Sequence, residues 1–171
     1  MLTRDHLMML DLLAHFEWKR PLCFSQPYIM KDYGLTNYAR YEGFCYTFVP
    51  VYTNNRGNSG YLDHERLYPI FMGIKDGEDA TEPLRYGNIA DEGVLADHFT
   101  QYNLRASRAR EAFARVANQL IEEGEKEKAL ELLDRGLEVL PSPKIRYSDS
   151  NTYPFLEGYY TLGEWEKGDA L

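Results

Sequence analysis

Apolar positions recur with helical spacing from residue 109 to residue 140, and this is the clearest pattern in the chain. The first set lies on one face of a helix: Ala109, Ala112, Phe113, Val116, Ala117, Leu120 and Ile121. Gly124 ends this run, because glycine adopts a left-handed turn at little cost. The second set precedes Pro141 and comprises Ala129, Leu133, Gly136, Leu137 and Leu140. The pattern predicts two antiparallel helices joined by a short link.

Small residues make this helical hairpin more specific. Ala117, Ala129 and Gly136 fall where two helices must approach closely. The tetratricopeptide repeat has, in order, a large aromatic, a leucine-like residue, a small residue, an aromatic or apolar residue, a turn glycine, an alanine and a closing proline. The matching positions here are Phe113, Val116, Ala117, Leu120, Gly124, Ala129 and Pro141. The segment therefore resembles one tetratricopeptide hairpin, and a generic helical hairpin is the alternative.

A second copy of the pattern begins downstream. Phe155, Tyr159, Gly163 and Trp165 reproduce the first-helix and turn positions. The two turn glycines lie further apart than the usual period of about 34 residues, which an insertion around residues 145–152 would explain. The chain ends where the second helix of this copy should start, and a repeat without its partner exposes apolar surface. We therefore expect more protein to follow in the natural product.

Helix and strand signals mix in the N-terminal half. Thr3 predicts the N-cap of a helix that extends to about Phe16 and should be well buried. Residues 21–25 and 43–51 are apolar, aromatic or β-branched and predict strands, and residues 30–33 predict one helical turn.

Further along, Asp63 predicts the start of a short helix that Pro69 should kink or interrupt. Polar runs at residues 53–60 and 75–83 predict loops, and helical spacing resumes near His98. The whole pattern predicts a mostly helical α+β protein. A small α/β lobe with a short sheet is expected at residues 1–97, and tetratricopeptide-like hairpins, one full and one truncated, at residues 98–171.

The composition of the chain excludes some classes of partner and location. The 171 residues carry a net charge of -8, which argues against nucleic acid and anionic lipid as main partners. No run of about 20 apolar residues is present, so no membrane span is expected in this chain. The N-terminus also lacks the pattern of a signal peptide.

The sequence offers few candidate catalytic or metal-binding residues. His6, His15, His64 and His98 are scattered, without a metal-binding or nucleophile motif. The acidic group Asp76, Glu78 and Asp79 lacks a calcium-binding pattern and is interpreted as a solvated loop. We therefore expect no cofactor, no metal and no catalytic activity in this chain.

The two cysteines, Cys23 and Cys45, fall in predicted strands. Free, half-buried thiols are the simpler interpretation. A cross-strand disulfide would need an oxidising compartment and Cα atoms about 5.5 Å apart.

Four segments together resemble one family. They are residues 7–25 (LMMLDLLAHFEWKRPLCFS), residues 38–51 (YARYEGFCYTFVPV), residues 63–68 (DHERLY) and the repeat segment. They are similar to the soluble C-terminal region of multi-spanning Bacteroidetes membrane proteins that resemble protein O-mannosyltransferases, a family of unknown function. The resemblance implies a non-catalytic appendage on the periplasmic side of the inner membrane, within a larger membrane protein.

Two binding functions follow as expectations. The first is an interaction scaffold that holds a protein or peptide in the groove of the hairpins, with Arg108, Arg115, Asn118 and Gln119 as candidate contacts. A purely structural role for the hairpins competes with it. The second is recognition of a glycan or an acceptor peptide by the tyrosine-rich segment, with Tyr38 and Tyr41 as candidates.

Overall fold

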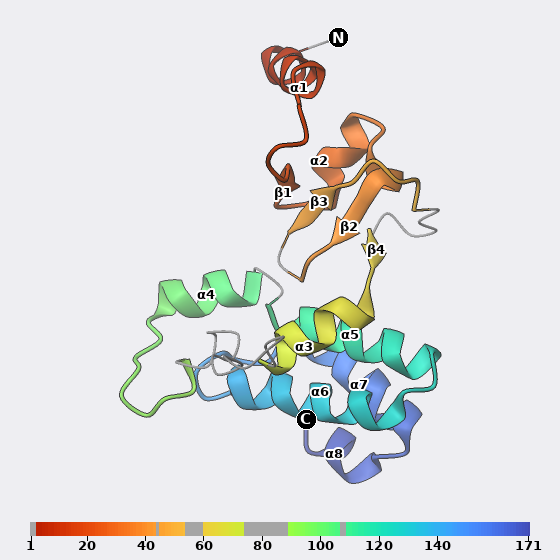
Figure 1. Cartoon of the computed structure of the whole chain (residues 1–171). Helices are drawn as coiled ribbons and strands as arrows, with labels where there is room; N and C mark the ends of the chain where they lie inside the picture. The colour runs from red at the N-terminus through yellow and green to blue at the C-terminus, as the bar shows by residue number, and fades with distance from the viewer. Residues whose placement is uncertain (1–2, 44, 54–59, 74–88, 107–108) are drawn as a thin grey trace, which may run out of the picture. The chain divides into compact units, whose positions relative to one another are not determined.

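The structure is a computed structural model that describes residues 3–43, 45–53, 60–73, 89–106 and 109–171. Its internal contacts divide the chain into two units, Met1–Tyr61 and Leu62–Leu171. Within the described residues, helices predominate and a short sheet lies near the N-terminus (Figure 1). This confirms the predicted α+β class. The polar runs at residues 54–59 and 75–83 lie outside the described residues, as does Arg108.

Unit 1 begins with helix α1, Arg4–Ala14, whose N-cap is Thr3 as predicted. The Thr3 N–H donates to His6 Nδ1 at 3.3 Å, which forms part of a capping box. The expectation that this helix is well buried was wrong, since Leu7 is 56% exposed and Met8 67%. The apolar residues of α1 occur on several sides of the helix. A neighbour on one side of a helix cannot cover all of them, and Leu7, Met8, Leu10 and Leu12 are exposed.

A four-stranded sheet follows α1, in the order β1-β3-β2-β4 (Figure 1). The strands are β1 (Cys23–Phe24), β2 (Ala39–Tyr41), β3 (Tyr46–Phe48) and β4 (Tyr61–Leu62). The one-turn helix predicted near residue 30 is α2, Pro27–Asp32, and the 3-10 helix η1, Thr36–Tyr38, leads into β2. The core of the unit comprises Phe24, Met30, Ala39, Tyr41 and Tyr46.

Strand β3 is shorter than the predicted strand at residues 43–51. Tyr41 and Tyr46 are directly opposed on β2 and β3, so the chain turns back between the two strands. The Glu42 N–H donates to the Cys45 carbonyl at 2.9 Å and closes this turn. A turn was not apparent in the sequence because the segment is rich in aromatic and β-branched residues.

Unit 2 is helical. It contains α3 (His64–Met72), α4 (His98–Ala106), α5 (Ala109–Glu122), α6 (Lys126–Val139), α7 (Asp149–Leu162) and α8 (Trp165–Asp169). Asp63 caps α3 as predicted, and its Oδ1 accepts from the Arg66 N–H at 3.2 Å. Pro69 does not interrupt α3, which continues to Met72. Glu65, whose carbonyl loses its helical partner at Pro69, is exposed to solvent, so the loss is tolerated.

Helix α5 is the centre of unit 2, where it packs against α3, α4, α6 and α7. Phe71 of α3 meets Phe113 of α5 edge to face, with ring centroids 4.6 Å apart. Because α3 packs here, the contacts divide the chain after Tyr61; the boundary predicted from the sequence lies after residue 97. The two turn glycines lie between α5 and α6 and between α7 and α8, with φ of 86° at Gly124 and 84° at Gly163.

Candidate functional site

Two helical hairpins, α5–α6 and α7–α8, form the first candidate site. The first helices of both pack against each other, and α7 also packs against α6. Gly136 lies at the closest approach, because a Cβ atom placed there would be 2.8 Å from Phe113 Cβ and 3.0 Å from Phe155 Cζ. Phe113 and Phe155 are fully buried. A small residue at this position therefore lets the two hairpins share one aromatic core.

Arg110 fixes the segment that connects the two hairpins. This residue is 2% exposed, and its Nη2 donates to the Leu140 carbonyl and, at 2.7 Å, to the Ile145 carbonyl. Its Nη1 donates to Asn151 Oδ1 at 3.2 Å, and the guanidinium lies 4.7 Å from the ring centre of Tyr147. Burial lowers the pKa of Arg110 from its usual value. This role of Arg110 was not predicted from the sequence, because an arginine beside an apolar stripe resembles a solvated position.

The predicted groove residues are not all available for a partner. Asn118 Nδ2 donates to the Pro154 carbonyl at 3.3 Å, so this side chain joins α5 to α7. Gln119 Nε2 donates to Glu123 Oε1 at 3.1 Å along the same helix. Arg115 is half-buried. Asn118 thus contributes to packing between the hairpins.

Helix α7 presents a face that the sequence analysis did not identify. Tyr153 is 65% exposed, Tyr160 is 37% exposed, and Glu157 is exposed between them. Their spacing of four and three residues places them on one side of the helix. The opposite side, with Phe155 and Tyr159, is buried against the neighbouring helices. We refer to Tyr153, Glu157 and Tyr160 as the α7 outer face.

Polar contacts connect α6, α7 and α8. The Tyr159 hydroxyl donates to Asp134 Oδ1 at 2.9 Å, and Lys167 Nζ lies 2.7 Å from Asp134 Oδ2. Burial, and then the bond to Asp134, raise the pKa of Tyr159 well above its usual value. The group therefore joins α7 and α8 to the second helix of the preceding hairpin.

The second candidate site is a cluster of aromatic rings in unit 1. It comprises Phe16, Trp18, Tyr38, Phe48 and Tyr52. Trp18 stacks on Phe48 with centroids 5.2 Å apart, and Tyr38 meets Phe48 at 6.3 Å and Tyr52 at 6.0 Å. Trp18 is 50% exposed and Tyr52 59%. We call this set the unit 1 aromatic cluster.

Trp18 has a backbone φ of 58°, in the left-handed region. A bulky residue adopts this conformation at a cost of about 1–3 kcal/mol, so the surroundings must enforce it. The ring contacts of Trp18 with Phe16, at 4.7 Å, and with Phe48 supply part of that enforcement. The consequence is a large aromatic ring held half in solvent.

The two tyrosines proposed for glycan recognition differ in accessibility. Tyr38 belongs to the unit 1 aromatic cluster and is half-buried. Tyr41 is 6% exposed, and its hydroxyl donates to the Gly43 carbonyl at 2.6 Å. Tyr41 is thus part of the core of unit 1.

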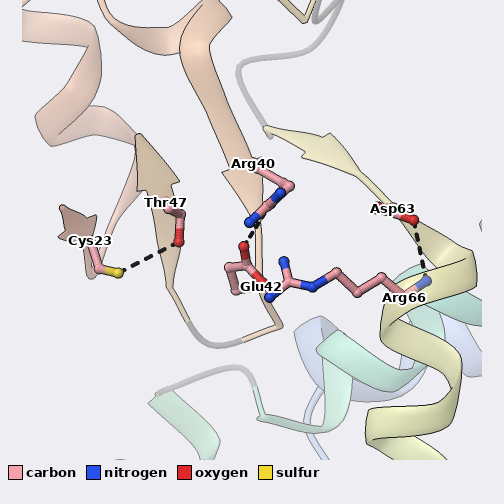
Figure 2. A network of polar contacts seen from close by, with 6 residues as sticks. All are labelled: Cys23, Arg40, Glu42, Thr47, Asp63 and Arg66. Atoms are coloured by element: carbon pink, nitrogen blue, oxygen red, sulfur yellow. Dashed lines mark hydrogen bonds and ion pairs between the residues drawn. The ribbon is translucent and has the colours of Figure 1, made fainter. Parts of the chain in front are cut away.

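Figure 2 shows the polar contacts on the strands of unit 1. Arg40 Nε lies 2.7 Å from Glu42 Oε1, and Cys23 Sγ lies 3.5 Å from Thr47 Oγ1 across the β1–β3 pair. Both cysteines are free thiols; Cys23 is exposed and Cys45 is half-buried. Cys45 lies just before β3, in the turn, rather than within a strand as predicted.

The described residues hold no group of three or more histidine, cysteine, aspartate or glutamate side chains placed to bind a metal ion. None of the helices in the described ranges combines the length and apolar character needed to cross a bilayer.

Comparison with known proteins finds a family model that matches the N-terminal part of the chain. Residues 1–66 match the family model described as TMEM260-associated domain 2. This domain is linked to TMEM260, a protein O-mannosyltransferase-like membrane protein. No curated protein and no solved structure matches the chain. The match covers unit 1 and the first residues of α3, and it associates the chain with a glycosyltransferase-related membrane protein.

Proposed function

We propose that this chain is a non-catalytic module of a larger, glycosyltransferase-like membrane protein, placed on the periplasmic side of the inner membrane. In this proposal, the tetratricopeptide-like hairpins α5–α6 and α7–α8 act as an interaction scaffold. The family match of residues 1–66 supports the membrane-protein context. The scaffold role rests on the repeated hairpin with its shared core at Gly136, Phe113 and Phe155.

The partner chemistry follows from the α7 outer face. Exposed tyrosines provide contact area at low cost in side-chain entropy, and Glu157 between them favours a cation. The net charge of -8 adds a long-range attraction for basic partners. The proposed ligand is an extended peptide that contains lysine or arginine.

Selection from a displayed library of random peptides on the purified chain tests this proposal. We expect the selected peptides to be enriched in lysine and arginine and to bind less tightly as salt increases. In Glu157→Lys, affinity should fall about tenfold, which corresponds to about 1.4 kcal/mol. Tyr153→Ala should weaken the same peptides.

Glu127→Lys is the matched control, because Glu127 is an exposed glutamate on α6 rather than on α7. Its charge change equals that of Glu157→Lys, so general electrostatics would affect both variants alike. Equal losses in the two variants, or no enrichment of basic peptides, would contradict the scaffold proposal and favour a purely structural role for the hairpins.

A second candidate function is recognition of a glycan by the unit 1 aromatic cluster. The observation that favours it is the exposed ring of Trp18, held against Phe48 despite an unfavourable backbone conformation. Aromatic faces of this kind stack on the apolar faces of sugar rings. The candidate ligand is a neutral oligosaccharide of hexoses.

Tryptophan fluorescence can report on this cluster alone. The chain has two tryptophans, so Trp165→Phe leaves Trp18 as the single emitter. Addition of hexose oligosaccharides should change its emission in a saturable way, and Tyr52→Ala should weaken the response. Tyr28→Ala serves as the control, since Tyr28 is 63% exposed but lies on α2. An unchanged emission spectrum at saturating oligosaccharide would refute this candidate.

A further inference from the structure

Both cysteines lie at the junction of β1 and β3. The antiparallel register places Cys23 opposite Thr47 and Phe24 opposite Tyr46. Side chains alternate along a strand, so Cys23 and Thr47 share one face of the pair, and Phe24 and Tyr46 share the other. Phe24 and Tyr46 are both buried, and the Cys23 and Thr47 side chains meet at 3.5 Å. Continuing this alternation two residues back from Thr47 brings Cys45 to the side of Cys23.

The environment of the Cys45 thiol includes Cys23. Burial is the main cause that raises the pKa of the Cys45 thiol to about 11, and the nearby Cys23 and the charge of Glu42 add to it. Cys23 is exposed, so a soluble reagent reaches it first.

We propose that Cys23 and Cys45 form a disulfide that ties β1 to the turn between β2 and β3. A disulfide requires Cβ atoms about 3.5–4.5 Å apart. The Cβ atoms of diagonal neighbours on paired strands are somewhat less than about 7–8 Å apart. Cys45 can move closer to Cys23 because it precedes β3 and lies outside the β1–β3 ladder. The bond would secure β1, which is only two residues long.

The oxidant is a small disulfide such as oxidised glutathione. The Cys23 thiolate attacks one sulfur of that disulfide, forms a mixed disulfide and releases one molecule of thiol. The Cys45 thiolate then attacks the Cys23 sulfur and displaces the second molecule of thiol. In total, the protein loses two S–H bonds and gains one S–S bond, while the oxidant is reduced to two thiols and takes up both hydrogens.

The second step should depend on pH. Burial and the nearby Glu42 keep Cys45 protonated near neutral pH, even though Glu42 is paired with Arg40. The thiolate is the attacking form, so the closing rate should rise about tenfold per pH unit between about pH 7 and pH 9. The mixed disulfide at Cys23 should therefore accumulate at pH 7 and convert at higher pH.

The test uses the full chain, incubated with oxidised glutathione at pH 7, 8 and 9, then quenched with iodoacetamide. We expect an intact mass lower by two hydrogen atoms and no added alkyl groups. Trypsin should release residues 20–31 and 41–56 as one linked pair that reduction separates. Cys45→Ser should stop at the glutathione adduct on Cys23.

Other outcomes of the same experiment would contradict the proposed disulfide. Persistent glutathione adducts on both cysteines at pH 9, or disulfide-linked dimers without the internal link, would overturn the proposal. A wild-type closing rate that does not change with pH would contradict the proposed order of attack. Because Cys23→Ser and Cys45→Ser each retain one thiol, they show separately which adduct forms and how fast.

Discussion

At the scale of single residues, the packing of unit 2 depends on Gly136, where an added Cβ atom would be too close to its neighbours. Gly136 lies within the interior of α6, where glycine is disfavoured by about 1 kcal/mol relative to alanine. Glycine is nevertheless favoured at this position, because Phe113 and Phe155 occupy the space that a Cβ atom would need. Phe113 presents its own Cβ there, an atom that can move only with the backbone of α5.

We expect Gly136→Ala to destabilise the chain by about 1–2 kcal/mol, because overpacking of about 1–3 kcal/mol outweighs the gain in helix propensity. Urea denaturation followed by helical circular dichroism measures the change. Gly93→Ala is the control, because no heavy atom lies within 4 Å of the Cβ atom that it would add. An equal loss of stability in Gly93→Ala would show that the helices do not approach as described.

A second prediction at this scale concerns the contribution of Arg110 to stability. Its guanidinium is the donor for the carbonyls of Leu140 and Ile145, and a buried carbonyl left without a donor costs about 1–3 kcal/mol. We therefore expect Arg110→Met to lower the free energy of unfolding by about 2–4 kcal/mol. Arg110→Lys should lose less, because an ammonium group still reaches one carbonyl. A change within about 0.5 kcal/mol in Arg110→Met would contradict this role.

At the scale of elements, the contact of Tyr159 with Asp134 and Lys167 connects α6, α7 and α8. The folded state holds Tyr159 in its neutral form, since its pKa is raised above the ordinary value of 10.0. The unfolded chain loses this proton first as pH rises. The stability from this group is thus complete below about pH 10 and is lost at higher pH.

We predict that the free energy of unfolding falls as the pH rises above about 10, with a limiting slope of about 1.4 kcal/mol per pH unit for one proton. Tyr159→Phe should reduce that fall. Tyr68, whose pKa is raised to about 12 by burial and by its bond to Glu131, remains in both proteins and cancels in the comparison. Parallel pH profiles for the two proteins would contradict the assignment.

The elements also show what local sequence can predict. Helices α5 and α6 were predicted because their apolar period, turn glycine and closing proline are all local signals. The burial of α1 was predicted incorrectly, since amphipathicity indicates that a face can be covered but not that a neighbour exists. The turn before β3 was hidden by residues with high strand propensity.

At the scale of the whole molecule, the α+β class followed from the sequence, but the candidate sites did so only in part. Tyr38 lies in the unit 1 aromatic cluster, whereas Tyr41 is in the core and Asn118 joins two helices. The α7 outer face and Arg110 were missed. Side-chain exposure depends on which helices meet, and a single sequence does not contain that information.

The proposed role as a module of a larger membrane protein can be tested in cells that produce the chain. The cells are fractionated and blotted with an antibody against residues 109–171. We expect a band well above 19.9 kDa in the membrane fraction. A soluble band near 19.9 kDa, with none in the membranes, would contradict it and leave a stand-alone binding protein.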